Sequence, residues 1–361
     1  MGPWERRVAI VPEDVSKLTS RHIRLLIQSG AGEGSFFPDS QYASTGVEII
    51  KERNEVILLS DVLVMLGRPT EEDVNTARQG TVFVGMIMPS LNHDLANLIA
   101  VKKLVAHSLE LLPRTSRAQS MDVLSSQSSV AGYRAAVVGA FHSPRIMPML
   151  STAAGTIRPA KVLVIGAGVA GLMAISTARR MGASVTAYDV RKAACEDVRS
   201  LGANFLELGI DAVGTGGYAR ELSADEKEKE RMLLEEAIVN SDLIITTAGV
   251  PGKKAPLIIT RRMVGIMKGG SVIVDITAES GGNCELTRAG DTLEYHGVKV
   301  IGLSNAQSEA QVNASQMYSR NMLSFLSVLI SADGIIVDPN KDELLKSTLV
   351  RPQSPISSGR G

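Results

Sequence analysis

The chain has 361 residues, more than one domain of ordinary size, and its 44% hydrophobic residues are enough to fill two cores. Lysine plus arginine equals aspartate plus glutamate at 38 each, so no basic surplus would attract nucleic acid or an anionic membrane. Two cysteines exclude a disulfide framework, the five histidines lack metal-ligand spacing, and no apolar run is long enough for a bilayer span or a signal peptide. We therefore expect a soluble protein of a reducing compartment, with no metal and no nucleic-acid partner.

The first third of the chain alternates short apolar runs with helical segments, as α/β domains do. Strands are predicted at 6–12, in the second half of 56–66, at 81–86 and near 101–111. The last of these leads into the polar stretch 113–122, which is followed by an apolar helix around 130–138. Side chains that follow strands lie at the carboxyl edge of a parallel sheet, so this stretch is a candidate ligand loop.

The middle of the chain carries a glycine pattern directly after a buried strand, 162–165. Each glycine has its own physical reason. Gly166 closes a tight turn, Gly168 lets backbone N–H groups approach a pyrophosphate, and Gly171 lets the next helix lie close on the strand. The alternative is a glycine-rich turn in an ordinary α/β domain, but the strand and helix around it favour dinucleotide binding.

An acidic residue follows at the distance such a turn requires. Asp189 ends the next apolar strand, 184–188, where a carboxylate can bind the ribose hydroxyls of NAD and repel the 2′-phosphate of NADP. Arg191 is discordant, because a basic side chain at this place can instead neutralise a 2′-phosphate. We give the acid more weight and expect NAD(H).

A long insertion follows the helix at 192–201 and the short strand at 204–208. Helical periodicity returns only at about 229–240, whereas ordinary connections have two to six residues. The insertion is either disordered or a lid, and in the second case Tyr218 lies over a bound cofactor.

Three more strands are predicted, at 242–247, 271–275 and 298–301. The first two end in small, polar turns, 248–252 and 276–283, which belong at the carboxyl edge beside the glycine turn. Tight turns alone would also explain these residues.

The C-terminal region predicts one long amphipathic helix at 311–330 and a disordered tail at 351–361. The stretch 150–157 is expected to connect the two domains. We expect a discontinuous N-terminal domain of residues 1–125 plus 315–361 and an NAD(H)-binding domain of residues 126–314.

Four stretches together resemble a known family. They are 117–127, 152–157, the glycine turn with 188–191, and 281–285. They are similar to the NAD(H)-binding domain of proton-translocating NAD(P) transhydrogenase, within the alanine dehydrogenase/transhydrogenase superfamily. The similarity covers roughly residues 5–340 and implies an α/β protein of two doubly wound, Rossmann-like parallel-sheet domains with a cleft between them.

The resemblance also implies the roles of particular residues. It places Arg114, Gln119 and Asp122 in the loop that holds the nicotinamide and its ribose, with Ser125 nearby and Tyr218 on a mobile loop. The full set of expected cofactor-binding residues is Gly166, Gly168, Val169, Ala170, Gly171, Asp189, Val190, Arg191, Tyr218, Thr247, Ala248, Gly249, Glu279 and Asn283. From the residues alone, Arg114 and Asp122 would equally form a structural salt bridge.

The partners implied are a second copy of the chain, an NADP(H)-binding domain and a membrane proton-channel domain. In the complete enzyme, of the Re/Si-specific type, hydride passes from NADH to NADP+ while the membrane domain passes protons. The chain would then be a soluble domain beside a membrane, at a bacterial cytoplasmic face or the matrix side of an organelle.

Alanine dehydrogenase is the main alternative. Amino-acid oxidation requires proton donors and acceptors and a cation for the substrate carboxylate. The stretches where that family has a lysine and a histidine read 66–69 and 85–89 here, with Gly67 in place of the lysine and no histidine. Direct hydride transfer between two nicotinamides requires only proximity, alignment and exclusion of water. A non-catalytic NAD-sensing module and a saccharopine-type dehydrogenase are two further alternatives.

Overall fold

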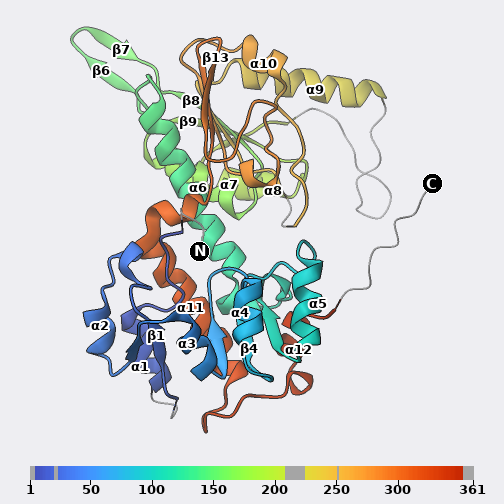
Figure 1. Ribbon diagram of the computed structural model, residues 1–361. Helices are drawn as coiled ribbons and strands as arrows, with labels where there is room; N and C mark the ends of the chain where they lie inside the picture. Colours follow the sequence, from blue (N-terminus) through green and yellow to red (C-terminus); the bar gives the residue numbers. More distant parts are fainter. Residues whose placement is uncertain (1–4, 20–22, 208–223, 250–251, 353–361) are drawn as a thin grey trace. The chain divides into compact units, whose positions relative to one another are not determined.

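The computed structural model describes residues 5–19, 23–207, 224–249 and 252–352 (Figure 1). The chain divides into two compact units, residues 1–127 with 307–361 and residues 128–306, and each is described by itself. Helix α6 (Val123–His142) runs through the boundary between them. No helix in the described ranges has the length and apolarity needed to cross a membrane.

The second unit is built on a seven-stranded sheet of order β10-β9-β8-β11-β12-β14-β13, parallel except for β13. Its strands are β8 (Lys161–Ile165), β9 (Ser184–Tyr188), β10 (Asn204–Phe205), β11 (Leu243–Thr246), β12 (Val272–Asp275), β13 (Thr292–Tyr295) and β14 (Val298–Gly302). Its other helices are α7 (Val169–Arg180), α8 (Ala194–Ser200), α9 (Ala224–Val239) and α10 (Arg261–Gly265).

Both faces of this sheet are buried, which explains why its strands are continuous apolar runs. Val162 and Val164 belong to a cluster with residues of α6, α7 and α8. Leu163 and Ile165 point to the other face, into a cluster with residues of α9 and α10. The unit is therefore doubly wound, as the sequence predicts.

Small residues allow the helices on the first face to pack closely. A Cβ atom on Gly132 of α6 would lie 2.0 Å from the carbonyl oxygen of Ala170 in α7. Ala135 and Ala136 of α6 and Ala174 and Ala178 of α7 complete this contact region of the core. Larger side chains here would push the helices apart.

The first unit contains two parallel sheets, β1-β2 and β3-β4-β5. Their strands are β1 (Leu26–Gln28), β2 (Glu48–Ile50), β3 (Val62–Val64), β4 (Val82–Gly85) and β5 (Val105–Ser108). The helices are α1 (Pro12–Thr19), α2 (Asp39–Ala43), α3 (Arg53–Leu59), α4 (Glu71–Thr76), α5 (His93–Val101), α11 (Gln311–Leu329) and α12 (Glu343–Thr348).

Helices also cover both faces of β3-β4-β5. Val82 and Val84 pack with Tyr318 and Phe325 of α11, whereas Phe83 belongs to the cluster on the opposite face. Phe325 is fully buried, and burial of a side chain of this size contributes about 1.5–3 kcal/mol to stability. The C-terminal helix thus returns to the first unit.

Two expectations from the sequence are wrong. Residues 6–12 form no strand, because the N–H groups of Arg6, Val8 and Val11 donate to the hydroxyls of Ser308, Ser315 and Ser319 instead of to a neighbouring strand.

The second wrong expectation concerns residues 150–157, which we expected to connect the two domains. They form an antiparallel hairpin of β6 (Leu150–Thr152) and β7 (Gly155–Ile157). The hairpin projects from the second unit (Figure 1). Helix α9 also begins within the predicted insertion, at Ala224, while Tyr218 lies outside the described residues.

Candidate functional site

The turn between β8 and α7 has the geometry that a bound diphosphate requires. Gly166 has φ +97°, a conformation that favours glycine, and a Cβ atom on Gly171 would lie 1.8 Å from the Gly166 carbonyl oxygen. Gly168 is the N-cap of α7, no side chain caps this helix end, and a Cβ atom at Gly168 would meet nothing within 4 Å. The first N–H groups of α7, at Val169 and Ala170, thus begin beside open space, and such groups bind anions.

Asp189 follows β9 beside this turn, and both of its carboxylate oxygens are engaged. Oδ2 accepts the N–H of Ala167 at 2.7 Å, while Arg191 donates its backbone N–H at 2.8 Å and its Nε at 2.9 Å to Oδ1. Burial alone would raise the pKa of Asp189, but the hydrogen bonds and charge of Arg191 and the Ala167 N–H together lower it. The carboxylate is ionised at neutral pH, and the Arg191 side chain covers it. Val190, between them, is exposed.

The turns after β11 and β12 are joined to the glycine turn. The Thr247 hydroxyl donates to the Gly166 carbonyl oxygen at 2.9 Å, and Ala248 forms two hydrogen bonds with the side-chain amide of Asn283. Asn283 is fully buried, whereas Gly249 is exposed at the end of the first turn. The carboxyl edge of the sheet therefore carries three turns that are fixed relative to one another.

Glu279 lies in the short 3₁₀ turn Ala278–Ser280 and is exposed. Its carboxylate accepts the hydroxyl of Ser304 at 2.5 Å. This bond fixes the side chain beside the end of β14.

The predicted nicotinamide loop lies in the first unit, after β5. Arg114 and Gln119 are exposed, and Gln119 belongs to the 3₁₀ segment Ser116–Met121. Asp122 accepts the backbone N–H of Ser125 at 2.9 Å and its hydroxyl at 2.6 Å. Asp122 therefore caps α6 by accepting from Ser125 in its first turn. Among the described residues, the alternative salt bridge between Arg114 and Asp122 is not formed.

The structure thus brings the sequence-predicted residues into two groups. One group, in the second unit, comprises the glycine turn, Asp189–Arg191, Thr247–Gly249, Glu279 and Asn283. The other, in the first unit, comprises Arg114, Gln119, Asp122 and Ser125. Within the described ranges, no three histidine, cysteine or acidic side chains are grouped so that they could bind a metal ion.

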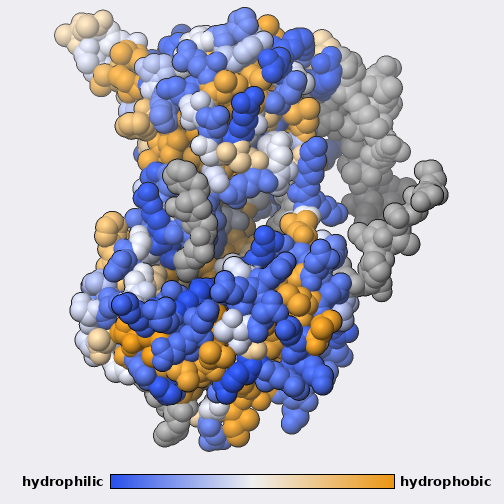
Figure 2. Space-filling view, viewed as in Figure 1, coloured by the Kyte–Doolittle hydropathy of each residue, from blue (hydrophilic) through white to orange (hydrophobic). Residues whose placement is uncertain are grey.

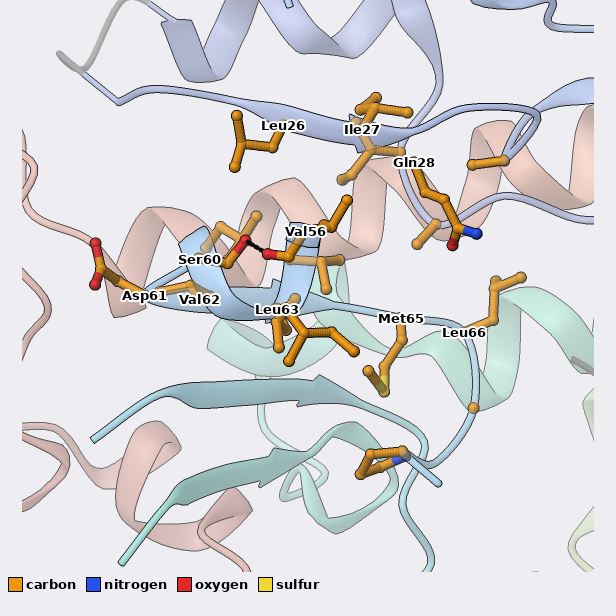
Figure 3. A pocket seen from close by; sticks show the side chains of 18 of the residues that line it. Leu26, Ile27, Gln28, Val56, Ser60, Asp61, Val62, Leu63, Met65 and Leu66 are labelled. Carbon is orange, nitrogen blue, oxygen red and sulfur yellow. Dashed lines mark hydrogen bonds between the residues drawn. The ribbon is translucent and has the colours of Figure 1, made fainter. Parts of the chain in front are cut away.

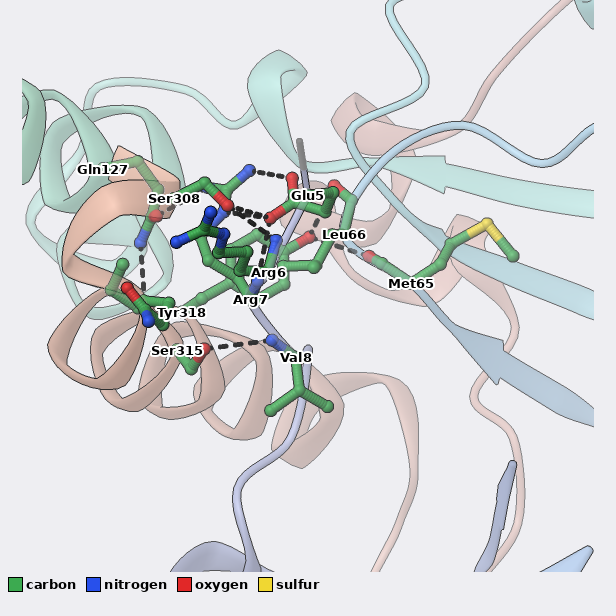
Figure 4. A network of polar contacts seen from close by, with 12 residues as sticks. Glu5, Arg6, Arg7, Val8, Met65, Leu66, Gln127, Ser308, Ser315 and Tyr318 are labelled. Carbon is green, nitrogen blue, oxygen red and sulfur yellow. Dashed lines mark hydrogen bonds and ion pairs between the residues drawn. The ribbon is translucent and has the colours of Figure 1, made fainter. Parts of the chain in front are cut away.

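A charged network in the first unit bears on amino-acid oxidation (Figure 4). Arg7 is buried and donates Nε and Nη2 to Glu5 at 2.8 and 2.6 Å and Nη1 to Gln127 at 2.7 Å. Tyr318 donates its hydroxyl to the Met65 carbonyl oxygen at 2.8 Å. The Arg7 guanidinium is therefore paired internally with a carboxylate.

A cavity of about 1700 Å³ also lies in the first unit (Figure 3). Apolar side chains of β1 and β3, among them Leu26, Ile27 and Leu63, line it. None of the sequence-predicted site residues is part of its lining. Its size therefore does not mark the candidate site.

Sequence reasoning missed Asp275, which is completely buried at the end of β12 and binds the turn that carries Asn283. A signal was present, since an acidic residue ends an otherwise apolar strand and a threonine follows two positions later. The pairing of Arg191 with Asp189 was also missed. In the sequence analysis the acid indicates NAD and the arginine indicates NADP, so the two residues were considered as alternatives.

A doubly wound parallel sheet with a glycine turn between a strand and a helix N-terminus defines a Rossmann-type α/β protein. Comparison with known proteins identifies the family to which the chain belongs. Residues 1–131 match the family model "Alanine dehydrogenase/PNT, N-terminal domain", and residues 135–357 match "Alanine dehydrogenase/PNT, C-terminal domain". The chain therefore belongs to the alanine dehydrogenase/PNT family.

Relatives narrow the position within this family. The chain is 40% identical to an alpha-subunit polypeptide of NAD(P) transhydrogenase from Rhodospirillum rubrum over 358 residues, 96% of this chain and 93% of that one. It is 32% identical to alanine dehydrogenase of Mycolicibacterium smegmatis over 287 residues, 79% of this chain and 72% of that one.

The crystal structure of transhydrogenase from Sinorhizobium meliloti matches with a TM-score of 0.87 at 40% identity, covering 97% of this chain and 96% of that one. The resemblance to transhydrogenase is thereby confirmed, and the chain is a transhydrogenase-related oxidoreductase.

Proposed function

We propose that the chain is the NAD(H)-binding component of a proton-translocating, Re/Si-specific NAD(P) transhydrogenase. Hydride passes directly from NADH on this chain to NADP+ on a partner domain, while a separate membrane domain moves protons. The chain itself lies beside the membrane, at a bacterial cytoplasmic face or on the matrix side of an organelle. The observation that carries the proposal is the uncapped N-terminus of α7 above Gly168, in a chain similar to transhydrogenase over nearly its full length.

The residues of the second unit fit NAD(H). The open space at Gly168 and the N–H groups of α7 suit a pyrophosphate, and Asp189 is an ionised carboxylate at the end of the next strand. In this proposal Asp189 accepts the adenosine ribose hydroxyls, and Arg191 moves away from it. Thr247, Ala248 and Gly249 present backbone and small side chains to the second half of the dinucleotide.

The loop of the first unit supplies orientation. The cofactor provides the hydride, so the chain needs no acid or base at the reacting carbon. Arg114 and Gln119 are exposed donors that hold the nicotinamide and its ribose, and the capped start of α6 keeps Asp122 and Ser125 rigid. Tyr218, the remaining residue of the predicted site, lies outside the described residues.

The geometry does not favour amino-acid oxidation. The buried guanidinium of Arg7 is already bound by Glu5 and Gln127. The turns after β3 and β4, at 65–69 and 85–89, contain neither lysine nor histidine. These positions offer no group to carry the protons of imine formation and hydrolysis.

We also propose a homodimer formed through the second unit. Phe141 of α6 is 82% exposed, Met149 is 64% exposed, and Ile157 of the projecting hairpin is 52% exposed. Figure 2 shows hydrophobic colouring at the hairpin and beneath it. An apolar surface on a two-stranded hairpin requires a covering partner to be stable, and a second copy provides one by symmetry.

A mixing assay tests the proposal. The protein is combined with an NADP(H)-binding transhydrogenase domain, NADH and an NADP+ analogue whose reduced form absorbs at a separate wavelength. We expect oxidation of NADH matched by reduction of the analogue, and no turnover of L-alanine with NAD. Turnover of L-alanine, or NADH binding without any transfer, would contradict the proposal.

A further inference from the structure

A buried carboxylate organises the turn after β12. Asp275 has no exposed surface, and its Oδ1 accepts the backbone N–H of Thr277 at 2.9 Å and the Thr277 hydroxyl at 2.7 Å. Its Oδ2 accepts the N–H of Asn283 at 2.7 Å, the N–H of Cys284 at 3.2 Å and the hydroxyl of Thr287 at 2.8 Å. Five donors from both ends of the turn thus converge on one side chain.

Asn283 extends this network to the turn after β11. Its Oδ1 accepts the N–H of Ala248 at 3.1 Å, and its Nδ2 donates to the carbonyl oxygens of Ala248 at 2.7 Å and Pro256 at 2.8 Å. The Asn283 side chain itself is fully buried. Each partner is a backbone group, and the amide therefore fixes the path of the chain at Ala248.

The same turn is bound to the glycine turn on its other side. The hydroxyl of Thr247 donates to the Gly166 carbonyl oxygen, and a Cβ atom on Gly166 would lie 2.7 Å from that hydroxyl oxygen. A continuous chain of hydrogen bonds thus runs from Asp275 through Asn283 and the turn after β11 to Gly166.

The position of these hydrogen bonds in the sheet indicates what they do. β8 and β11 are neighbours although β9 and β10 lie between them in sequence, so the strand order reverses there. Ligands of α/β sheets bind across such a reversal. A dinucleotide with its pyrophosphate at the glycine turn therefore has its second half beside Ala248 and Gly249.

We propose that Asp275 and Asn283 are positioning residues that set the Ala248–Gly249 backbone for the nicotinamide half of NAD(H). This inference rests on the proposed function. Neither side chain touches the cofactor, because both are buried and bonded to protein groups. Replacing Asp275 by asparagine turns one acceptor oxygen into a donor that faces other donors, which displaces the turn.

The test compares NADH with ADP, which has the adenosine and diphosphate of NADH but no nicotinamide. Binding of NADH and of ADP is measured by calorimetry for Asp275→Asn, Asn283→Ala and the wild type. We expect the dissociation constant for NADH to rise at least tenfold and that for ADP to change less than twofold. Asn283→Ala leaves the Asp275 carboxylate intact and provides the readout if Asp275→Asn does not fold.

Asp242 offers a matched control at the opposite edge of the same sheet. It precedes β11, is buried, accepts the N–H of Lys161 at 2.9 Å and pairs with Arg145 at 3.2 Å. Asp242→Asn should change the binding of neither ligand, although it also removes a buried carboxylate charge from this sheet.

Two results would overturn the inference in distinguishable ways. Equal weakening of NADH and ADP in both variants would show a general structural role, with the proposed function intact. A wild-type protein that binds neither ligand would remove the proposed function itself.

Discussion

The carboxylate of Asp122 accepts both the backbone N–H and the hydroxyl of Ser125, and in this way it begins helix α6. The cap accounts for the presence of an acid at this position without any reference to a cofactor. Arg114 has no comparable structural bond in the described structure and is exposed. The two residues therefore give different experimental signatures.

Arg114→Ala should slow hydride transfer at least tenfold while leaving NADH affinity and thermal stability nearly unchanged, because the side chain orients the ring and supports no fold contact. Single-turnover kinetics and calorimetry measure the two effects. Arg117→Ala is the matched control, since Arg117 lies in the same loop but pairs with Asp342. Equal losses of rate and affinity in Arg114→Ala would contradict an orienting role.

Asp122→Ala should lower the free energy of unfolding by about 1 kcal/mol through loss of the cap. Asp122→Asn retains an acceptor oxygen for the Ser125 N–H and should keep most of that stability. If Asp122→Asn still slows hydride transfer, the carboxylate acts on the cofactor as well as on the helix. Chemical denaturation and the mixing assay separate the two contributions.

Asp189→Ala should relax discrimination against NADPH by at least tenfold, because it removes a negative charge and releases the Arg191 guanidinium to bind a 2′-phosphate. The double variant Asp189→Ala/Arg191→Ala should lose this gain. A double-mutant cycle measures this coupling. It compares the dissociation constants for NADH and NADPH in the wild type, the two single variants and the double variant. Unchanged discrimination in Asp189→Ala would show that this carboxylate is not the selector.

His107 makes the stability of the first unit depend on pH. Burial lowers the pKa of His107 from 6.5 to about 4. As the pH falls, the unfolded chain therefore binds a proton at a higher pH than the folded chain does. The free energy of unfolding is highest above pH 6.5 and decreases by on the order of 3 kcal/mol between pH 6.5 and about pH 4.

His107→Gln should flatten this dependence even if its stability at pH 7 is lower, because glutamine does not titrate. Urea unfolding at several pH values between 7 and 4 measures the slope. Parallel slopes for the variant and the wild type would show that other groups cause the dependence.

The proposed dimer predicts that Phe141→Glu combined with Ile157→Glu yields a monomer, because charges would be buried at a symmetric apolar contact. Light scattering after size-exclusion chromatography measures the mass. Val101→Glu, which changes a 76% exposed side chain of the first unit, should leave the dimer intact. A dimer that persists in the double variant would place the contact elsewhere.

Sequence patterns were sufficient for the central strands of the second unit, because strands buried on both faces are continuous β-branched runs such as 162–165. They failed at residues 6–12, where the hydroxyls of Ser308, Ser315 and Ser319, far away in the sequence, accept the backbone N–H groups. β1 and β2 were not predicted, although the equally short β3 was. β3 reads Val-Leu-Val, whereas β1 and β2 each include a polar residue, so no continuous apolar run marks them.

In the candidate site, too, some features could be predicted from the sequence and others could not. The glycine turn was predictable because each glycine has a local steric reason. The network of Asp275 was not, because its link to Ala248 through Asn283 depends on which turns the sheet brings together. The pairing of Asp189 with Arg191 is local, and it was missed because the two charges were interpreted as alternatives. Asp275 and Asn283 are eight residues apart, and Asn283 and Ala248 thirty-five.

Transfer of an isotopic label tests the central claim most directly. NADH carrying deuterium at the transferred C4 position is mixed with the protein, an NADP(H)-binding transhydrogenase domain and NADP+, and the products are analysed by mass spectrometry. Direct transfer between two nicotinamides predicts that deuterium appears in NADPH and none in water. Recovery of the label in solvent, or its retention in NAD+ while NADPH forms unlabelled, would contradict it.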